Sequence, residues 1–221
     1  MSSRSSTGLV ALAQTDFKRM IAYTSVNHMG YIVLAVGAAA ATADSSEQVR
    51  SLAVTGAVTQ MVSHGLLTGA LFLLAGVLYE RGRTHDMGSY SGLAGAAPVF
   101  AALTGVAAFA SLGLPGFSGF IAELQIFSGS LGPRPLATAL SVIGILLTAG
   151  LFLRALRQVL MGPLRLPDAP GTPRALPDIR AHEGLAVVPL LALAVVLGVA
   201  PRFLLDVIEP ASRAVLELLA R

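Results

Sequence analysis

Two long stretches of this sequence contain no Asp, Glu, Lys or Arg, and this feature restricts the fold more than any other. They run from Met20 to Ala43 and from Leu52 to Tyr79, and a short polar segment joins them. A bilayer core requires about 20 apolar residues per spanning helix and tolerates only a backbone whose hydrogen bonds are satisfied internally. The two stretches therefore predict a hairpin of transmembrane helices.

The rest of the chain continues this pattern. Further apolar runs cover 97–113, 120–131, 136–160 and 184–200. Charged residues make up 12% of the chain, against roughly 25% in soluble globular domains. We expect an all-α, multi-pass protein of the cell (inner) membrane with about six transmembrane segments.

The sequence predicts four parts, each with its own composition. They are a polar N-terminal tail and loop at 1–19, a transmembrane bundle at 20–160, a loop rich in Pro and Arg at 161–183, and a final transmembrane helix with a surface segment at 184–221.

The third and fourth apolar runs flank a predicted break. Three glycines and one proline lie within residues 112–119, LGLPGFSG. Glycine lowers helix propensity and proline removes a backbone donor, so a helix should be interrupted near 112–123. The run that follows is too short to span a bilayer alone.

Glu123 is the single acidic residue inside the apolar runs. An ionised carboxylate at membrane depth costs several kcal/mol unless it is paired, hydrated or protonated, so it is a functional candidate by default. Broken helices are a recurring way to build ion sites in membranes. The alternative is a solvated carboxylate near the membrane surface.

Two polar stripes mark the first two helices. Gln60, His64 and Thr68 recur every four residues and therefore share one helix face. Thr24, Asn27, His28 and Tyr31 form a similar stripe on the first helix. Histidine titrates near neutral pH and passes protons through either ring nitrogen. Two facing stripes would enclose a file of water, whereas hydrogen bonds that merely join two helices are the alternative.

Other classes of site are excluded by what the sequence lacks. The chain has no Cys, so it contains no disulfide, thiolate metal site or iron–sulfur ligand set. It also lacks a phosphate loop and zinc-type His and Glu spacing. The basic residues are scattered between apolar runs, which argues against a nucleic-acid partner. Lys18 precedes the first helix, where an interaction with lipid headgroups explains it.

Four segments carry longer motifs, namely ALAQTDFKRMIAYTSVNHMG at 11–30, QMVSHG at 60–65, LYER at 78–81 and SLGLPGFSGF at 111–120. In this order they resemble the antiporter-like membrane subunits of respiratory complex I, the family of subunit M of NADH-quinone oxidoreductase and mitochondrial subunit 4. The resemblance covers nearly the whole chain but only the C-terminal part of a usual family member.

The resemblance implies a function and roles for individual residues. The chain would form the second half-channel repeat of a proton-translocating subunit that couples quinone reduction to proton transfer. Glu123 matches the carboxylate of the family's discontinuous helix, which is the terminal proton site. His64 and His28 match histidines of the central hydrophilic axis. Apart from the resemblance, the residues of the two polar stripes and the start of the first helix supply the candidate supporting polar face, namely Gln60, Thr68, Thr24, Asn27 and Lys18.

The resemblance also implies partners and leaves alternatives open. This would be a non-catalytic membrane subunit without cofactors of its own, since NADH, flavin, iron–sulfur clusters and quinone belong to partner subunits. The family's earlier repeat, with its glutamate and paired lysines, is absent here, so we expect a separate N-terminal half among the other membrane subunits in the bilayer. The alternatives are a subunit of a multisubunit cation/proton antiporter or membrane-bound hydrogenase complex, and a truncated, non-transporting scaffold.

Overall fold

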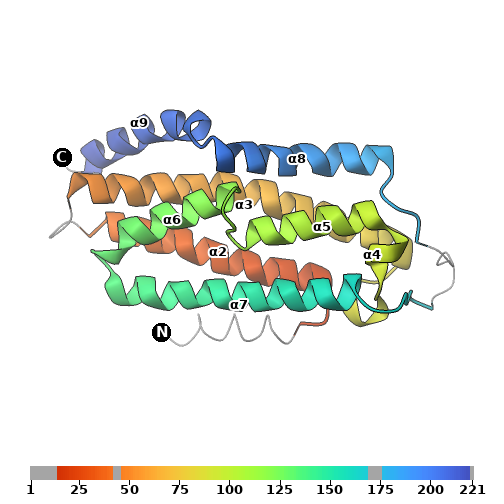
Figure 1. Cartoon of the computed structure of the whole chain (residues 1–221). Helices are drawn as coiled ribbons and strands as arrows, with labels where there is room; N and C mark the ends of the chain where they lie inside the picture. The colour runs from red at the N-terminus through yellow and green to blue at the C-terminus, as the bar shows by residue number, and fades with distance from the viewer. Residues whose placement is uncertain (1–13, 42–45, 169–175, 220–221) are drawn as a thin grey trace.

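The computed structural model describes residues 14–41, 46–168 and 176–219. Figure 1 shows an elongated bundle in which most helices run along one common direction. The long helices are α2 (Phe17–Ala39), α3 (Glu47–Gly82), α5 (Pro98–Ser111), α6 (Ser118–Leu131), α7 (Pro135–Leu160), α8 (Ala181–Val199) and α9 (Arg202–Leu219). Two short helices, η1 (Met87–Ser89) and α4 (Leu93–Ala96), lie between α3 and α5.

The six apolar runs coincide with helices α2, α3, α5, α6, α7 and α8. Within the described residues, α3, α7 and α8 are long and apolar enough to cross a membrane unaided. Helix α5 is a shorter apolar helix, and α6 follows it after the break. The structure is therefore the all-helical membrane bundle that the sequence predicts.

Helix α3 is the central element. It has 36 residues and extends about 54 Å at 1.5 Å per residue, well beyond the roughly 30 Å thickness of a bilayer core. It contacts α2, α5, α6, α8 and α9. Its buried side chains Leu67, Leu71, Leu74 and Leu78 belong to the main hydrophobic core. Helices α2, α5, α6, α8 and α9 are therefore positioned by their packing on α3, whereas α7 packs on α2, α5 and α6.

Helix α2 begins within the segment predicted as a loop up to residue 19. The carboxylate of Asp16 accepts a hydrogen bond of 2.8 Å from the backbone N–H of Arg19, which caps the helix. The backbone N–H of Phe17 donates to the carbonyl of His85 at 2.8 Å. The Asp16 cap and the hydrogen bond to His85 explain why the helix starts three residues before its predicted start at residue 20. Lys18 therefore lies in its first turn.

The break between α5 and α6 lies at residues 112–117. Gly113 and Gly116 have φ angles of 71° and 98°, in the left-handed region that favours glycine. The helix resumes at Ser118, so Glu123 lies in the second turn of α6 and not in the unwound segment. The predicted interruption is confirmed, and it is narrower than the 112–123 range that the sequence suggested.

The C-terminal part departs slightly from its predicted boundaries. Helix α8 starts at Ala181, inside the segment assigned to the 161–183 loop, and residues 169–175 of that loop lie outside the description. Helix α9 is amphipathic. It buries Ile208 and Leu216 while Asp206, Arg213 and Glu217 are exposed, and it continues beyond α8 along α3 (Figure 1).

Candidate functional site

Glu123 is enclosed by protein. Its side chain is 7% exposed, and it faces the unwound segment. A Cβ atom at position 113 would overlap its Oε2 atom, so the carboxylate fits only because residue 113 is glycine. The ion pairs within the described residues are Arg81–Glu183 and Glu209–Arg213, so no cation there pairs with Glu123. The helix break and the carboxylate therefore form one structural unit.

The two predicted histidines meet between α2 and α3. The Nδ1 atoms of His28 and His64 lie 3.3 Å apart, and their rings make an edge contact with centroids 5.4 Å apart. One nitrogen of such a pair must donate while the other accepts, so the two rings share a proton position. The Thr68 hydroxyl lies 3.2 Å from His64 Nδ1. The polar stripes of the two helices do face each other.

Asn27 and Tyr31 extend this polar region toward α7. Asn27 Nδ2 lies 2.8 Å from the Tyr31 hydroxyl, 3.0 Å from Thr148 Oγ1 and 3.2 Å from the Gly144 carbonyl oxygen. The Tyr31 ring packs edge-on against Phe127, one turn after Glu123 on α6. Tyr31 therefore lies between the histidine pair and the helix that carries the carboxylate.

The remaining predicted residues are less central. The Thr24 hydroxyl bonds back to the carbonyl of Ile21 at 2.8 Å, so its own helix satisfies it. Gln60 is buried, and its Oε1 atom has no hydrogen-bond partner in the described protein. Lys18 is exposed, ten residues or about 15 Å along α2 from His28. The structure thus does not bring Lys18 to the buried site.

Sequence reasoning missed several buried polar residues, some of them beside the break. The hydroxyls of Ser63 on α3 and Ser118 at the start of α6 lie 2.8 Å apart and are buried. Thr148 was missed because it is an isolated polar residue in an apolar run. Buried oxygens without a partner in the described protein include those of Thr104, Ser111, Gln125 and Ser130. Buried polar atoms of this kind are ordinarily satisfied by internal water.

The described residues provide no obvious metal centre, since they contain no group of three or more His, Cys, Asp or Glu side chains. The arrangement instead suits proton chemistry. Tyr31 contacts His28 of the histidine pair and Phe127 on the helix that carries the buried carboxylate, and the buried oxygens of Gln60 and Gln125 have no partner in the described residues.

Comparison with known proteins shows that the chain matches a known family. Residues 3–148 match the family described as NADH:quinone oxidoreductase/Mrp antiporter, TM. NADH-quinone oxidoreductase subunit M of Rhodobacter capsulatus is 36% identical over 204 residues, which cover 92% of this chain and 37% of that protein. The chain therefore spans well under half the length of this curated relative.

Solved structures agree with that match. A chain of respiratory complex I from Thermus thermophilus with bound NADH has a TM-score of 0.81 and 30% identity, covering 96% of this chain and 42% of that one. A chain of the Mrp complex from Dietzia sp. DQ12-45-1b has a TM-score of 0.76 over 95% of this chain and 44% of that one. Its identity of 22% indicates a shared fold and no more.

Proposed function

The chain belongs to the NADH:quinone oxidoreductase/Mrp antiporter membrane family, and we propose that it is a proton-translocating subunit of an NADH-quinone oxidoreductase in the inner cell membrane. It forms one half-channel and performs no redox chemistry. Partner subunits hold the NADH site, flavin, iron–sulfur clusters and quinone, and the energy of quinone reduction reaches this chain through changes in charge and conformation.

The observation that carries this proposal is the burial of Glu123 against the break. A carboxyl group in a poorly hydrated site is neutral or charged according to small changes in the water and charges around it. The unwound segment places backbone groups that are not part of a helix beside the carboxylate. Glu123 is therefore the terminal group that takes up a proton and releases it.

The histidine pair supplies the preceding step. His64 is half-buried, while His28 is deeply buried and contacts Tyr31 at a ring-centroid distance of 5.9 Å. A proton received at His64 passes to His28 through their Nδ1 atoms and continues toward Glu123 through internal water. The unpartnered oxygens of Gln60 and Gln125 are suitable anchors for that water.

Replacement of Glu123 by Gln in the assembled complex tests this function. Glutamine keeps the shape of the side chain but neither binds nor releases a proton. Membrane vesicles should show a strongly reduced number of protons moved per NADH oxidised, with unchanged NADH oxidation by an artificial acceptor. Leu124→Ala, at an exposed neighbouring position, is the control. An unchanged proton-to-NADH ratio in Glu123→Gln contradicts the assignment.

The Mrp part of the family description supports a second candidate, a subunit of a cation/proton antiporter. Such a subunit exchanges cations for protons when either gradient is imposed, without NADH. Vesicles that exchange Na⁺ for protons through this chain in the absence of NADH would favour the antiporter. Proton movement that requires NADH oxidation would favour the first proposal.

We further propose that a separate polypeptide supplies the other half-channel. Respiratory complex I of Thermus thermophilus, one chain of which resembles this chain, is an assembly, and this supports further membrane partners. Affinity purification of this chain from mildly solubilised membranes should recover a second membrane polypeptide homologous to the remaining part of subunit M. Recovery of redox subunits without such a polypeptide would contradict this partner.

A further inference from the structure

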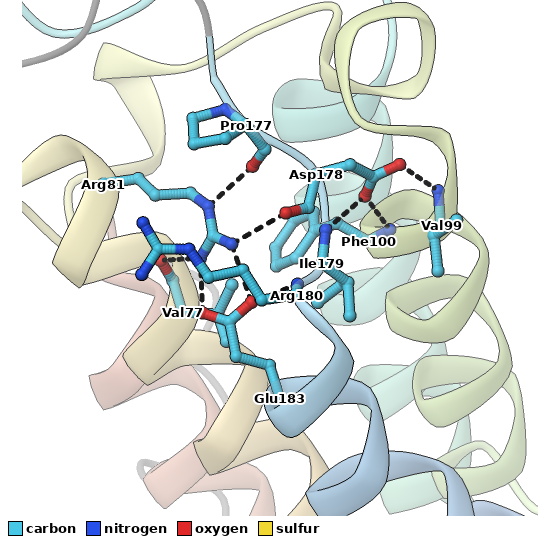
Figure 2. Close-up of polar contacts among 9 residues, drawn as sticks. All are labelled: Val77, Arg81, Val99, Phe100, Pro177, Asp178, Ile179, Arg180 and Glu183. Atoms are coloured by element: carbon cyan, nitrogen blue, oxygen red, sulfur yellow. Dashed lines mark hydrogen bonds and ion pairs between the residues drawn. The ribbon is translucent and has the colours of Figure 1, made fainter.

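Arg81 lies in the last turn of helix α3. Its side chain takes part in a buried network of hydrogen bonds that the proposed proton path does not use. Its Nη1 and Nη2 atoms donate to the two carboxylate oxygens of Glu183 at 3.0 and 2.7 Å, and the side chains of both residues are 7% exposed. The guanidinium also donates to the carbonyl oxygens of Val77, Pro177 and Asp178 at 3.1, 2.6 and 2.9 Å. All three guanidinium nitrogens are thus engaged (Figure 2).

Asp178 ties the same network to helix α5. Its carboxylate accepts hydrogen bonds of 2.9 Å from the backbone N–H groups of Val99 and Phe100, in the first turn of α5, and one of 2.7 Å from Ile179. Figure 2 shows these contacts beside the Arg81–Glu183 pair. Arg81, Asp178 and Glu183, here called the clasp, therefore join the end of α3 to the beginnings of α5 and α8.

Helices α5 and α8 both lead from the clasp to the break. Helix α5 ends at Ser111, where the unwound segment begins. Near the end of α8, Gly198 is packed against that segment so closely that a Cβ atom would overlap the backbone of Gly116 and Phe117. Residues 183 and 198 are separated by about 22 Å along α8 at 1.5 Å per residue. Both helices therefore set the distance between the clasp and the break, and their lengths over this distance are similar.

The unwound segment in turn bounds Glu123, through the contact between Gly113 and the carboxylate. An unbroken series of packed contacts thus leads from the clasp through α8 to Gly116 and Phe117, and along the same short segment to the carboxylate. A buried ion pair adds little net stability compared with apolar residues of the same volume, whereas its geometry is strict. The clasp is therefore better suited to fixing positions than to stabilising the fold.

We propose that Arg81 and Glu183 are positioning residues for Glu123: the clasp fixes where α5 and α8 begin, and these helices fix the unwound segment against the carboxylate. This inference rests on the proposed role of Glu123 as a proton-transfer group. Opening the clasp shifts α8 relative to α3 and changes the access of Glu123 to protons without touching it.

The test uses the assembled complex in membrane vesicles and two readouts. One is the number of protons moved per NADH oxidised. The other is the rate at which a hydrophobic carbodiimide modifies Glu123, measured by peptide mass spectrometry, since this reagent reacts with protonated carboxyl groups in apolar surroundings. The amount of assembled complex is determined in parallel and both readouts are normalised to it.

Glu183→Gln and Gly198→Ala open or displace the two ends of α8. Both should change the modification rate of Glu123 several-fold in the same direction and lower the proton-to-NADH ratio. Arg81→Lys, which keeps the charge but loses the paired geometry, should give an intermediate change. Gly184→Ala is the matched control on α8, because its Cβ would lie 3.5 Å from Ile179 and in ordinary contact. It should leave both readouts unchanged.

The proposal is overturned if Glu183→Gln and Gly198→Ala lower only the amount of complex and leave both normalised readouts at the wild-type level. If one of the two variants does not assemble, the other and Arg81→Lys decide by the same criterion. Failure of the proposed function looks different, since Glu123→Gln then keeps a normal proton-to-NADH ratio. The carbodiimide rate still reports whether the clasp controls the surroundings of Glu123.

Discussion

Gly113 and Gly116 both have positive φ angles, but only Gly113 borders the carboxylate of Glu123. An alanine at either position bears a backbone cost of about 1–2 kcal/mol. Gly116→Ala adds nothing further, because no atom lies within 4 Å of its Cβ. Gly113→Ala should therefore lose more thermal stability and also alter the carbodiimide reactivity of Glu123. Equal effects of the two variants on that reactivity would argue against the close contact at 113.

Asp178 lies outside the predicted membrane-spanning segments, and its carboxyl makes the stability of the fold depend on pH in the acidic range. Partial burial opposes its ionisation, but hydrogen bonds from the backbone of Val99, Phe100 and Ile179 and the charge of Arg81 hold the pKa of its carboxyl below the ordinary value. A carboxyl whose pKa is lower in the folded state stabilises the fold above its unfolded pKa, and this contribution is lost as the pH falls through the folded value.

Asp178→Asn removes that titration. The variant should be less stable than wild type near neutral pH, and the difference should shrink as the pH falls below about 4, the ordinary range of an aspartate pKa. Thermal unfolding of the detergent-solubilised complex across this pH range measures it. A stability difference that stays constant with pH would show that the Asp178 charge is not responsible.

At the scale of elements, α3 and α6 approach each other through glycines. A Cβ on Gly129 would lie 2.6 and 2.9 Å from the backbone N and Cα atoms of Ala53, which leaves no room for a methyl group. Small residues allow close helix contact in membranes, where packing is a main source of helix association. A Cβ on Gly56 would likewise lie 2.8 Å from the backbone N of Ile126, so the contact between these two helices depends on the absence of side chains at both glycines.

Gly129→Ala should destabilise the protein by about 1–3 kcal/mol, the usual cost of overpacking. The control is Gly150→Ala on α7, which meets no atom within 4 Å and should be neutral or stabilising by up to about 1 kcal/mol. Thermal unfolding in detergent compares the two variants. Equal stabilities would show that α3 and α6 can separate at no cost.

Most elements, but few of their contacts, were predictable from the sequence. Runs without charge predict helices reliably because the bilayer excludes other backbone structure, and the glycines and proline of 112–119 predicted the break. The pairing of Arg81 with Glu183 was not predictable, because 102 residues separate them and their meeting depends on the packing of α8 on α3. The sequence predicted that the polar stripes of the first two helices face each other, but it did not predict the direct contact between His28 and His64.

At the scale of the whole molecule, the half-buried position of His64 indicates that a partner covers this part of the surface. Met61 and Gly65 flank it on the exposed surface of α3. An imidazole in a spanning helix is costly against lipid, so such residues face protein or water-filled cavities. The proposed separate half-channel is the partner that would cover this surface.

A single introduced thiol tests directly whether a protein partner covers this surface, because the chain itself contains no Cys. Gly65→Cys is suited to the purpose, since a Cβ there meets no atom within 4 Å. A fluorophore attached to it should be quenched by nitroxide-labelled lipid when this chain is reconstituted alone, and protected in the assembled complex. Leu193→Cys, at an exposed position on α8, should be quenched in the isolated chain as well and provides the reference for lipid contact. If the fluorophore at position 65 is quenched to the same extent in both preparations, lipid and not a protein partner covers His64, and a proton path that enters there would lack the polar surroundings it needs.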